Sequence, residues 1–439
     1  MTEEAKDLKG PEISRKLFGG VLTYDGAGYY PGLELLNMVY GVKDEILPGK
    51  EKKEIKVSLS SHDFARRLVW DNNFDVHPMR EQVFVDEGEA EEALKHLLEC
   101  LQLEIPGSTL TPKWTRAHFF PYTKALIHWD ARSRDSRTPN KINIERQYLR
   151  GGGALAFKVL RLDPNQARLN NIREGFAALY GKEVTALDRL TSVLSEHGFK
   201  VKHEDTSVDR IEFKSVSEND ELEETYRDGV SRILGHTDLP SVSRIRTLMN
   251  WTGFWLILVE MDRAAKSLER PSPYILCDCC DGNHPQLRRG AQRCLKQILG
   301  LIENAVKQYV DSQSKQVKKA DQLKIRGFFW ATASTVKLLN AWKGRKHFTL
   351  GLDILETLVL AGCEKGGEIP FDRFLSEWLY EKCRIVIGRS AAEESNLLTS
   401  LDSSIFEDNE NELSNQMSAA GLLTQYSDAT RMVSAGGLN

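Results

Sequence analysis

The stretch PSVSRIRTLMNWTGFWLILVEMDRAAKSL, from Pro240 to Leu268, decides the fold. It has no internal helix breaker, and large apolar side chains such as Trp251, Phe254 and Trp255 crowd its middle. A helix that is apolar on most sides is buried inside a protein. Its longest apolar run, Trp251 to Met261, is much shorter than the roughly 20 residues that a bilayer span requires. We therefore expect this helix at the centre of a domain, with no membrane contact.

Helical patterns continue on both sides of this stretch. ALAFKVLRL (154–162), NQARLNNIREGFAALYG (165–181) and ENDELEETYRDGVSRILG (218–235) precede it, and an apolar stripe at helical spacing, 287–309, follows it. The fold class expected is mainly α with small β elements (α+β), in several domains. The boundaries expected are a mixed α/β region over 1–145, a mostly helical central domain over 146–347 and a separate C-terminal domain over 348–439.

The C-terminal domain has the element order of a winged helix. Helical, extended, helical and extended patterns follow one another in LGLDILETLVLAG, EIPF, DRFLSEWLYEKC and RIVIG, and DNENELSNQMSAAG with LLTQYSDATRMVS predicts a last helix and a hairpin. In this interpretation 390–407 is an insertion or a long loop.

Composition places the chain among folded intracellular proteins. The 439 residues are 41% apolar and 28% charged, and the net charge of -4 is small for this length, so the molecule is no general polycation. Seven cysteines are scattered without the spacing of a disulfide framework, and the charged amino terminus has no secretory signal pattern. We expect a cytoplasmic protein.

The segment PYILCDCCDGNHPQLRR (273–289) concentrates cysteines, aspartates and a histidine. A zinc site needs two separated ligand pairs, and here Cys277, Cys279 and Cys280 crowd together, while Cys294 lies in an apolar helical stripe. Buried thiols are the simpler interpretation, with Asp281 or Asn283 capping the next helix. No G-x-x-x-x-G-K-[ST] loop accompanies the aspartates, which argues against an ATPase. No metal and no cofactor is expected.

Two further patterns each allow two interpretations. The first is the run Arg150, Gly151, Gly152 and Gly153 before a helix. Such glycines can bind a phosphate, or they can allow a tight turn and close packing. In HEDTSVDRIEFKS an aspartate precedes a Glu-x-Lys. This resembles the PD-(D/E)xK nuclease pattern, without its proline, and implies a magnesium-dependent nuclease using Asp205, Glu212 and Lys214. Charged residues on the solvent face of a hairpin would look the same.

Charge is distributed unevenly along the chain. Residues 286–347 hold 14 basic and three acidic side chains, whereas 391–428 hold eight acidic residues and no lysine or arginine. Basic side chains near tryptophans suit a nucleic-acid backbone, and a solvated face or an acidic partner is the alternative. The candidate nucleic-acid-binding residues are Arg288, Arg289, Arg293, Lys296, Lys318, Lys319, Lys343, Arg345 and Lys346.

The function expected is that of a non-catalytic accessory subunit that binds DNA or RNA, DNA being preferred, and contacts partner proteins through its C-terminal domain. Acidic residues at the start of the last helix would repel phosphates, so that domain is expected to bind protein. The general texture of the chain is similar to that of accessory proteins in bacterial genome-defence (antiviral) systems, although no motif carries this likeness. The magnesium-dependent nuclease and a pure protein scaffold are the alternatives.

Overall fold

The computed structural model describes residues 8–24, 30–42, 45–51, 55, 59–60, 62–72, 80–84, 89–103, 117–128, 130–133, 142–145, 152–181, 184–196, 200–201, 220–281, 283–313, 317–340, 345–427 and 430–436. All structural statements below concern these residues. The fold is mainly helical with small sheets, as the sequence predicted. None of the described helices is long and apolar enough to cross a membrane.

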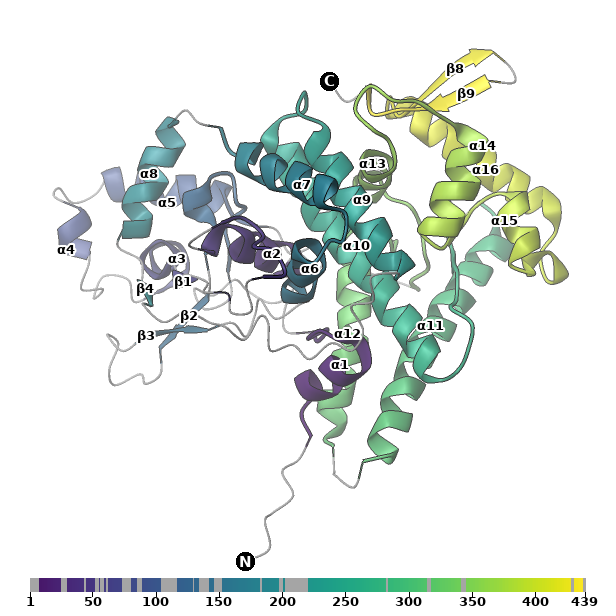
Figure 1. The fold of residues 1–439 in the computed structure, drawn as a ribbon, viewed down its shortest axis with the longest axis horizontal. Coiled ribbons are helices and arrows are strands. Elements are labelled where there is room, and N and C mark those ends of the chain that lie inside the picture. Colours follow the sequence, from purple (N-terminus) through teal and green to yellow (C-terminus); the bar gives the residue numbers. More distant parts are fainter. Residues whose placement is uncertain are drawn as a thin grey trace, which may run out of the picture.

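The central element is α10 (Ser241–Ser267), which lies in the middle of the molecule (Figure 1). Every residue from Thr247 to Ala265 is buried. Neighbouring helices surround it, which explains why its sequence is apolar on most sides. Trp255 donates from its indole nitrogen to the Leu222 carbonyl at 2.9 Å, and Trp251 donates to the Tyr226 carbonyl at 3.2 Å, so the buried indoles also satisfy their polar groups.

The first part of the chain supplies helices and short strands that lie mostly on the left of Figure 1, whereas its first helix lies below the centre. These are α1 (Gly10–Phe18), α2 (Tyr30–Gly41), β1 (Leu59–Ser60), α3 (Asp63–Trp70), α4 (Arg80–Val83), α5 (Glu89–Cys100), η2 (Lys124–Leu126), β2 (Asp130–Ser133) and β3 (Ile142–Glu145). β2 pairs with β3, and β1 pairs with β4 (Lys200–Val201), both antiparallel. The described sheets of this part are two-stranded.

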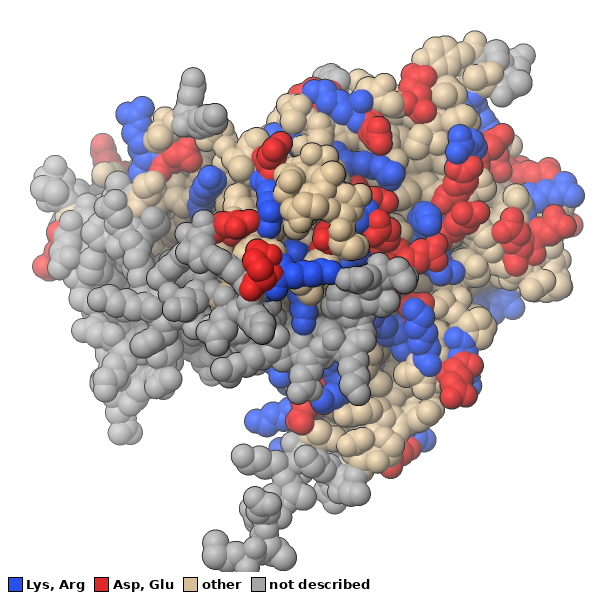
Figure 2. All heavy atoms as spheres, in the orientation of Figure 1, with Lys and Arg blue, Asp and Glu red and all other residues tan. Residues whose placement is uncertain are grey.

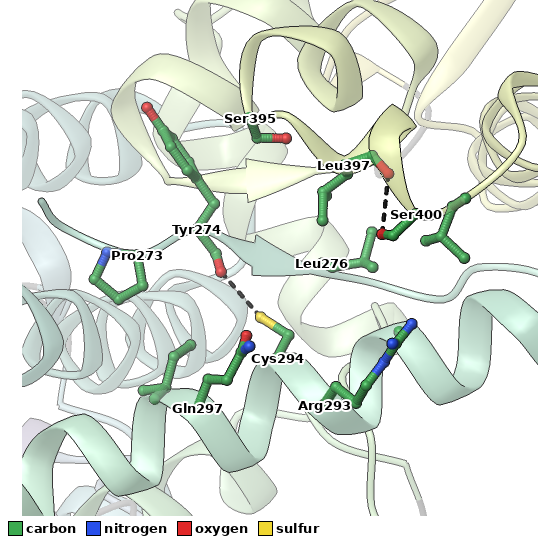
Figure 3. Close-up of a pocket in the computed structure, with 12 residues that line it drawn as sticks. Pro273, Tyr274, Leu276, Arg293, Cys294, Gln297, Ser395, Leu397 and Ser400 are labelled. Atoms are coloured by element: carbon green, nitrogen blue, oxygen red, sulfur yellow. Dashed lines mark hydrogen bonds between the residues drawn. The ribbon is translucent and has the colours of Figure 1, made fainter.

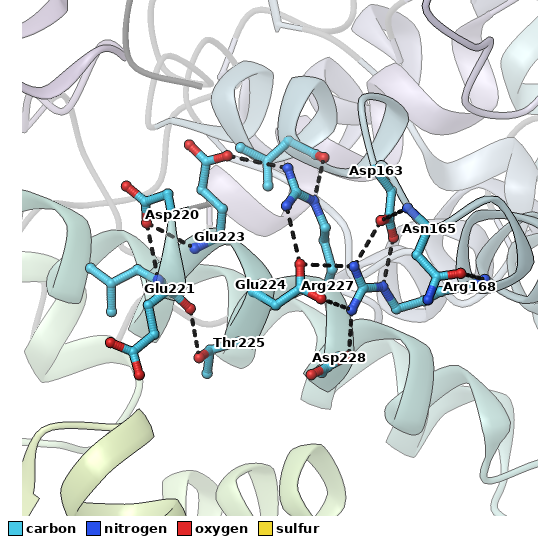
Figure 4. Close-up of polar contacts among 12 residues, drawn as sticks. Asp163, Asn165, Arg168, Asp220, Glu221, Glu223, Glu224, Thr225, Arg227 and Asp228 are labelled. Carbon is cyan, nitrogen blue, oxygen red and sulfur yellow. Dashed lines mark hydrogen bonds and ion pairs between the residues drawn. The ribbon is translucent and has the colours of Figure 1, made fainter. Parts of the chain in front are cut away.

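The helices α6 (Gly153–Arg161), α7 (Gln166–Leu179), α8 (Ala186–Glu196) and α9 (Glu221–Gly235) follow. A charged cluster joins α7 to α9 (Figure 4). Arg168 of α7 lies 2.7 Å from Asp163 and 2.6 Å from Asp228 of α9, and it also contacts Glu224. Burial raises the pKa of Glu223 to about 7, even though Arg227 and Arg263 contact it. These groups neutralise one another and hold the two helices together.

The next part is a helical pair. Strand β5 (Ile275–Leu276) leads through the cysteine-rich loop into α11 (Pro285–Asp311), and α12 (Lys319–Thr335) packs beside α11. The long stripe predicted for this region is present, because Leu287, Leu295, Ile298 and Ile302 of α11 are all buried. The opposite side of α11 faces solvent.

The last part begins with α13 (Leu352–Gly362), β6 (Ile369–Pro370) and α14 (Phe371–Arg373), which runs on into the π-helix η5 (Phe374–Lys382). Strand β7 (Ile385–Val386), α15 (Arg389–Glu394), η6 (Leu397–Thr399), α16 (Ser403–Ala419), β8 (Leu423–Ser427) and β9 (Thr430–Val433) complete it. β6, β9 and β8 form an antiparallel sheet in that order. β7 pairs in parallel with β5, which ties this part to the helical centre.

Candidate nucleic-acid interface

The exposed side of α11 carries five basic side chains. Arg289, Arg293 and Lys296 follow one another at helical spacing, and Arg288 and Lys307 lie on the same helix. All five side chains are exposed, and none makes a side-chain hydrogen bond or ion pair with another described residue. Cations that lack an internal partner are available to an external anion. We call these five residues the α11 basic face.

Two of the acidic residues near the α11 basic face, Glu303 and Asp321, pair with basic residues of α12, whereas Asp311 at the end of α11 is exposed. Glu303 of α11 lies 2.6 Å from Arg326 of α12, and Asp321 lies 3.3 Å from Lys324. Lys318 and Lys319, at the start of α12, are exposed and add to the positive surface. The local excess of positive charge expected from the sequence is therefore present on the described surface of the helical pair.

The three remaining candidates, Lys343, Arg345 and Lys346, follow α12 in the sequence. Lys346 is 9% exposed, and its ammonium donates to the Ser334 hydroxyl at 2.9 Å and lies 4.7 Å from the centre of the Trp330 ring. Burial lowers the pKa of Lys346 from its usual value. The structure thus places this lysine inside the protein, away from the α11 basic face. Arg345 is exposed, and Lys343 lies outside the described residues.

A hollow of about 350 Å³ adjoins the α11 basic face (Figure 3). Arg293 and Gln297 line it from α11, and Ser395 and Ser400 line it from the C-terminal part. Its walls also contain apolar side chains, including Leu276, Ile298, Leu397 and Leu401. A hollow lined by both polar and apolar side chains, with the guanidinium of Arg293 at its side, suits a partly apolar group that carries a negative charge.

Gly290 provides space at the floor of this hollow. A Cβ atom there would stand 3.0 Å from the Cδ2 of Leu276 and 3.2 Å from the Cδ1 of Leu401. Cys294 is half-buried beside it and donates from its thiol to the Tyr274 carbonyl at 3.0 Å. Burial raises the pKa of Cys294 to about 11, so the thiol stays protonated at neutral pH.

The cysteine-rich loop is buried and is held by α16. The Asn409 amide nitrogen donates to the carbonyls of Cys277 and Ile387, both at 3.1 Å, and its oxygen accepts from the Cys279 amide at 2.8 Å. Gln416 donates to the Cys279 carbonyl at 2.6 Å. These contacts fix the loop that leads into α11, and so they orient the α11 basic face.

The three cysteines of this loop are structural thiols. Each is at most 4% exposed, and all seven cysteines of the chain are free. Burial raises the pKa of Cys280 to about 11, and it raises those of Cys277 and Cys279 well above the usual value. Such groups are poor nucleophiles because little thiolate forms.

The expected side-chain cap of α11 is wrong. The helix begins at Pro285, and neither Asp281 nor Asn283 accepts from its first amides; His284 occupies the position before it without a side-chain cap bond. Proline at the first helical position lacks an N–H, which leaves one donor fewer to satisfy. Asp281 adopts a positive φ of 48° in the preceding turn.

Acidic side chains gather over the C-terminal elements on the right of Figure 2. On α16, Glu407 and Asp408 are exposed. Asp408 lies 3.4 Å from His284 at the start of α11, and Glu407 lies 3.1 Å from Arg389. The exposed side of α16 therefore carries acidic side chains, and Asn409 and Gln416 of the same helix contact the cysteine-rich loop.

The glycines before α6 have a packing role. Gly152 adopts a φ of +90°, and a Cβ on Gly153 would stand 2.4 Å from the Pro31 carbonyl oxygen in α2. The Gly153 amide donates to the Glu34 carboxylate at 2.9 Å, so the start of α6 already holds a buried anion from the chain itself. This arrangement leaves no room for a phosphate at these two residues. Arg150 and Gly151 lie outside the described residues, and so do Asp205, Glu212 and Lys214.

Sequence reasoning found the basic residues of α11 but missed the partners that organise them. Asn409 lies far along the chain from the loop that it holds, and nothing in its surrounding sequence distinguishes it from other helical asparagines. The serines that line the hollow carry no signal either. No family model, no curated protein and no solved structure matches the chain, so its function is inferred from its own residues.

Proposed function

We propose that this protein is a non-catalytic, nucleic-acid-binding accessory subunit, with DNA as the expected ligand. The observation that carries the proposal is the α11 basic face, whose five exposed cations lack internal partners in the described chain. Lys318 and Lys319 extend it at the start of α12. Neutralising phosphates with such residues releases condensed counterions, which drives binding of any sequence.

The dimensions of the α11 basic face fit a nucleic-acid strand. Arg289 and Lys307 are separated by about 27 Å at 1.5 Å per helical residue. One DNA strand carries a phosphate for about every 3.4 Å of helix axis, so this length spans roughly eight phosphates. The hollow beside Arg293 offers space for an unpaired base next to this track, which favours a strand with unstacked bases.

The C-terminal part is proposed as a winged-helix-like domain that contacts partner proteins. Its support is the order of α13, β6, α14, α16, β8 and β9 and the β6-β9-β8 arrangement of the sheet. In this interpretation α16 takes the place of the DNA-reading helix. Its exposed acidic residues and its contacts with the cysteine-rich loop support a role in protein contact instead. A cytoplasmic location belongs to the same proposal, supported by seven free cysteines.

The test is binding of labelled duplex DNA, single-stranded DNA and RNA by fluorescence anisotropy across a salt series. We expect affinity to fall linearly on a log–log plot against salt. The variant Arg289→Glu, Arg293→Glu, Lys296→Glu should bind every ligand more weakly and lower the salt slope by about 3, or about 1 for each lost phosphate contact. The matched control Lys95→Glu, Arg189→Glu, Arg270→Glu makes the same change in net charge at exposed residues on other elements and should bind like the unmodified protein.

The alternatives give different results in the same samples. Cut strands on a denaturing gel with magnesium would replace the proposal with a nuclease, and the Glu212→Ala variant would then abolish cleavage and keep binding. No binding at low salt would contradict both and leave a protein scaffold. Equal losses in the α11 variant and its control would show that net charge, and not the α11 basic face, governs binding.

A further inference from the structure

A second hollow lies between α10 and α13, helices that Figure 1 shows side by side at the centre of the molecule. Its volume is about 190 Å³, and its lining comes from residues 239–250 and 353–360. Pockets for drug-sized ligands hold roughly 300–1,000 Å³, so this one can take only a small molecule. No residue of the α11 basic face lines it.

Opposite charges face this hollow without pairing. Arg246 lines it from α10, and Asp353 and Glu356 line it from α13. None of the three makes an ion pair with a described residue. By contrast, Arg373 and Glu377, which lie one helical turn apart, form an ion pair at 2.7 Å. The guanidinium carbon of Arg246 lies 6.0 Å from the centre of the Phe120 ring, which steadies it.

The carboxylates and the guanidinium are close enough to influence one another. Burial raises the pKa of Glu356, the charge of Asp353 raises it further, and the charge of Arg246 opposes this rise. The three charges therefore surround one space. A ligand with a positive and a negative group attached to one carbon could pair with the carboxylates and with the guanidinium together, which a single ion could not do.

The floor of the hollow contains an unsatisfied polar group. Asn250 is 1% exposed, and its Oδ1 has no hydrogen-bond partner in the described chain. Because this oxygen is closed off from solvent, the atom of Asn250 that can face the hollow is its amide nitrogen, a hydrogen-bond donor. Leu239 and Leu360 are the buried apolar part of the lining, and they suit a small aliphatic group.

We propose that this hollow binds a small aliphatic α-amino acid as its zwitterion. The ammonium meets the carboxylates of Asp353 and Glu356, and the Asn250 amide nitrogen, a donor, faces the carboxylate of the ligand. The carboxylate meets the guanidinium of Arg246, and the side chain lies against Leu239 and Leu360. This site is independent of nucleic-acid binding and gives the protein a small-molecule ligand next to its central helix.

The experiment is calorimetric titration of the full-length protein with glycine, alanine, valine and leucine, and with matched derivatives. N-acetylation removes the ammonium charge, and conversion to the primary amide removes the carboxylate. We expect at least one free amino acid to bind and both of its derivatives to bind roughly 10- to 100-fold more weakly, since each loses a charge-assisted contact. A thermal shift with the same ligands gives a second readout.

Variants at the rim keep the test independent of folding, because these side chains are not fully buried. Arg246→Gln and Glu356→Gln should each weaken the amino acid by a similar factor. The matched controls Arg270→Gln and Glu364→Gln change exposed residues elsewhere and should leave its affinity unchanged. The proposal is overturned if no free amino acid binds at millimolar concentration, if a derivative binds as well as its parent, or if the rim variants bind like their controls.

Discussion

At the scale of single residues, the sequence alone did not reveal which polar side chains are buried. Thr247, Asn250 and Glu260 lie on the central helix among apolar side chains, and each is buried. Glu260 has no hydrogen-bond partner in the described chain, and burial raises its pKa well above the usual value. Periodicity identified the helix, but burial of these particular side chains depends on neighbours that are distant in sequence.

The buried histidines predict a dependence of stability on pH. His62 and His128 pack with ring centres 4.6 Å apart, and His118 stacks on His128 at 5.3 Å. Burial, with Arg66 nearby, lowers the pKa of His62 to about 4. Burial lowers that of His128 well below its usual value, and the charges of His62, Arg66 and His118 add to this effect. Both rings are therefore neutral in the folded protein.

The sign follows from proton binding. Between about pH 4 and pH 6.5 the unfolded chain protonates His62 and the folded chain does not, so the free energy of unfolding falls as pH falls through this window. The shift of His62 alone corresponds to roughly 3 kcal/mol. We expect the urea midpoint of the unmodified protein to decline from pH 7 to pH 5 relative to that of His62→Phe, which lacks this group. Glu223 titrates in the opposite sense, so the difference between the two proteins isolates His62. If the urea midpoints of both proteins changed equally with pH, the assignment of this effect to His62 would be contradicted.

At the scale of elements, long regular helices were predictable and their connections were not. The apolar stripe of α11 and the apolar faces of α10 specify those helices through local spacing. The α11 basic face follows from the same spacing, because residues opposite a buried stripe must face solvent. The same reasoning fails for Lys346. This lysine belongs to a basic run in the sequence, but its side chain is buried in the structure.

The contact between α16 and the cysteine-rich loop predicts a large effect of one substitution. Asn409→Ala leaves the carbonyls of Cys277 and Ile387 and the amide of Cys279 without their partner in a buried site. Each such group costs about 1–3 kcal/mol, so we expect a loss on the order of 3 kcal/mol or more in the free energy of unfolding. Chemical denaturation followed by tryptophan fluorescence measures it. Asn415→Ala, at an exposed position of the same helix, should change it by less than about 0.5 kcal/mol.

At the scale of the whole molecule, the largest buried apolar cluster runs through all three predicted regions, from Leu8 to Ala435. Trp378 of the C-terminal part stacks on Trp251 of α10 with ring centres 5.8 Å apart, and β7 pairs with β5. Local patterns predicted most elements of 348–439, but they missed α15 and η6, which lie in the stretch expected to be an insertion or a long loop. They could not reveal this shared core, since the contacts join residues more than a hundred positions apart.

This shared core predicts how the chain responds to being divided after residue 347. The fragment 1–347 would expose Trp251 and leave β5 without β7, and the fragment 348–439 would expose Trp378. Exposure of large apolar surfaces promotes association. We expect 1–347 to elute as aggregates in size-exclusion chromatography and to bind a hydrophobic dye, unlike the full chain, and addition of 348–439 during refolding to restore a single soluble species. The opposite result would be two soluble monomeric fragments that unfold at the same temperature as the full chain. In that case the C-terminal part folds independently, and its contacts with α10 contribute little to stability.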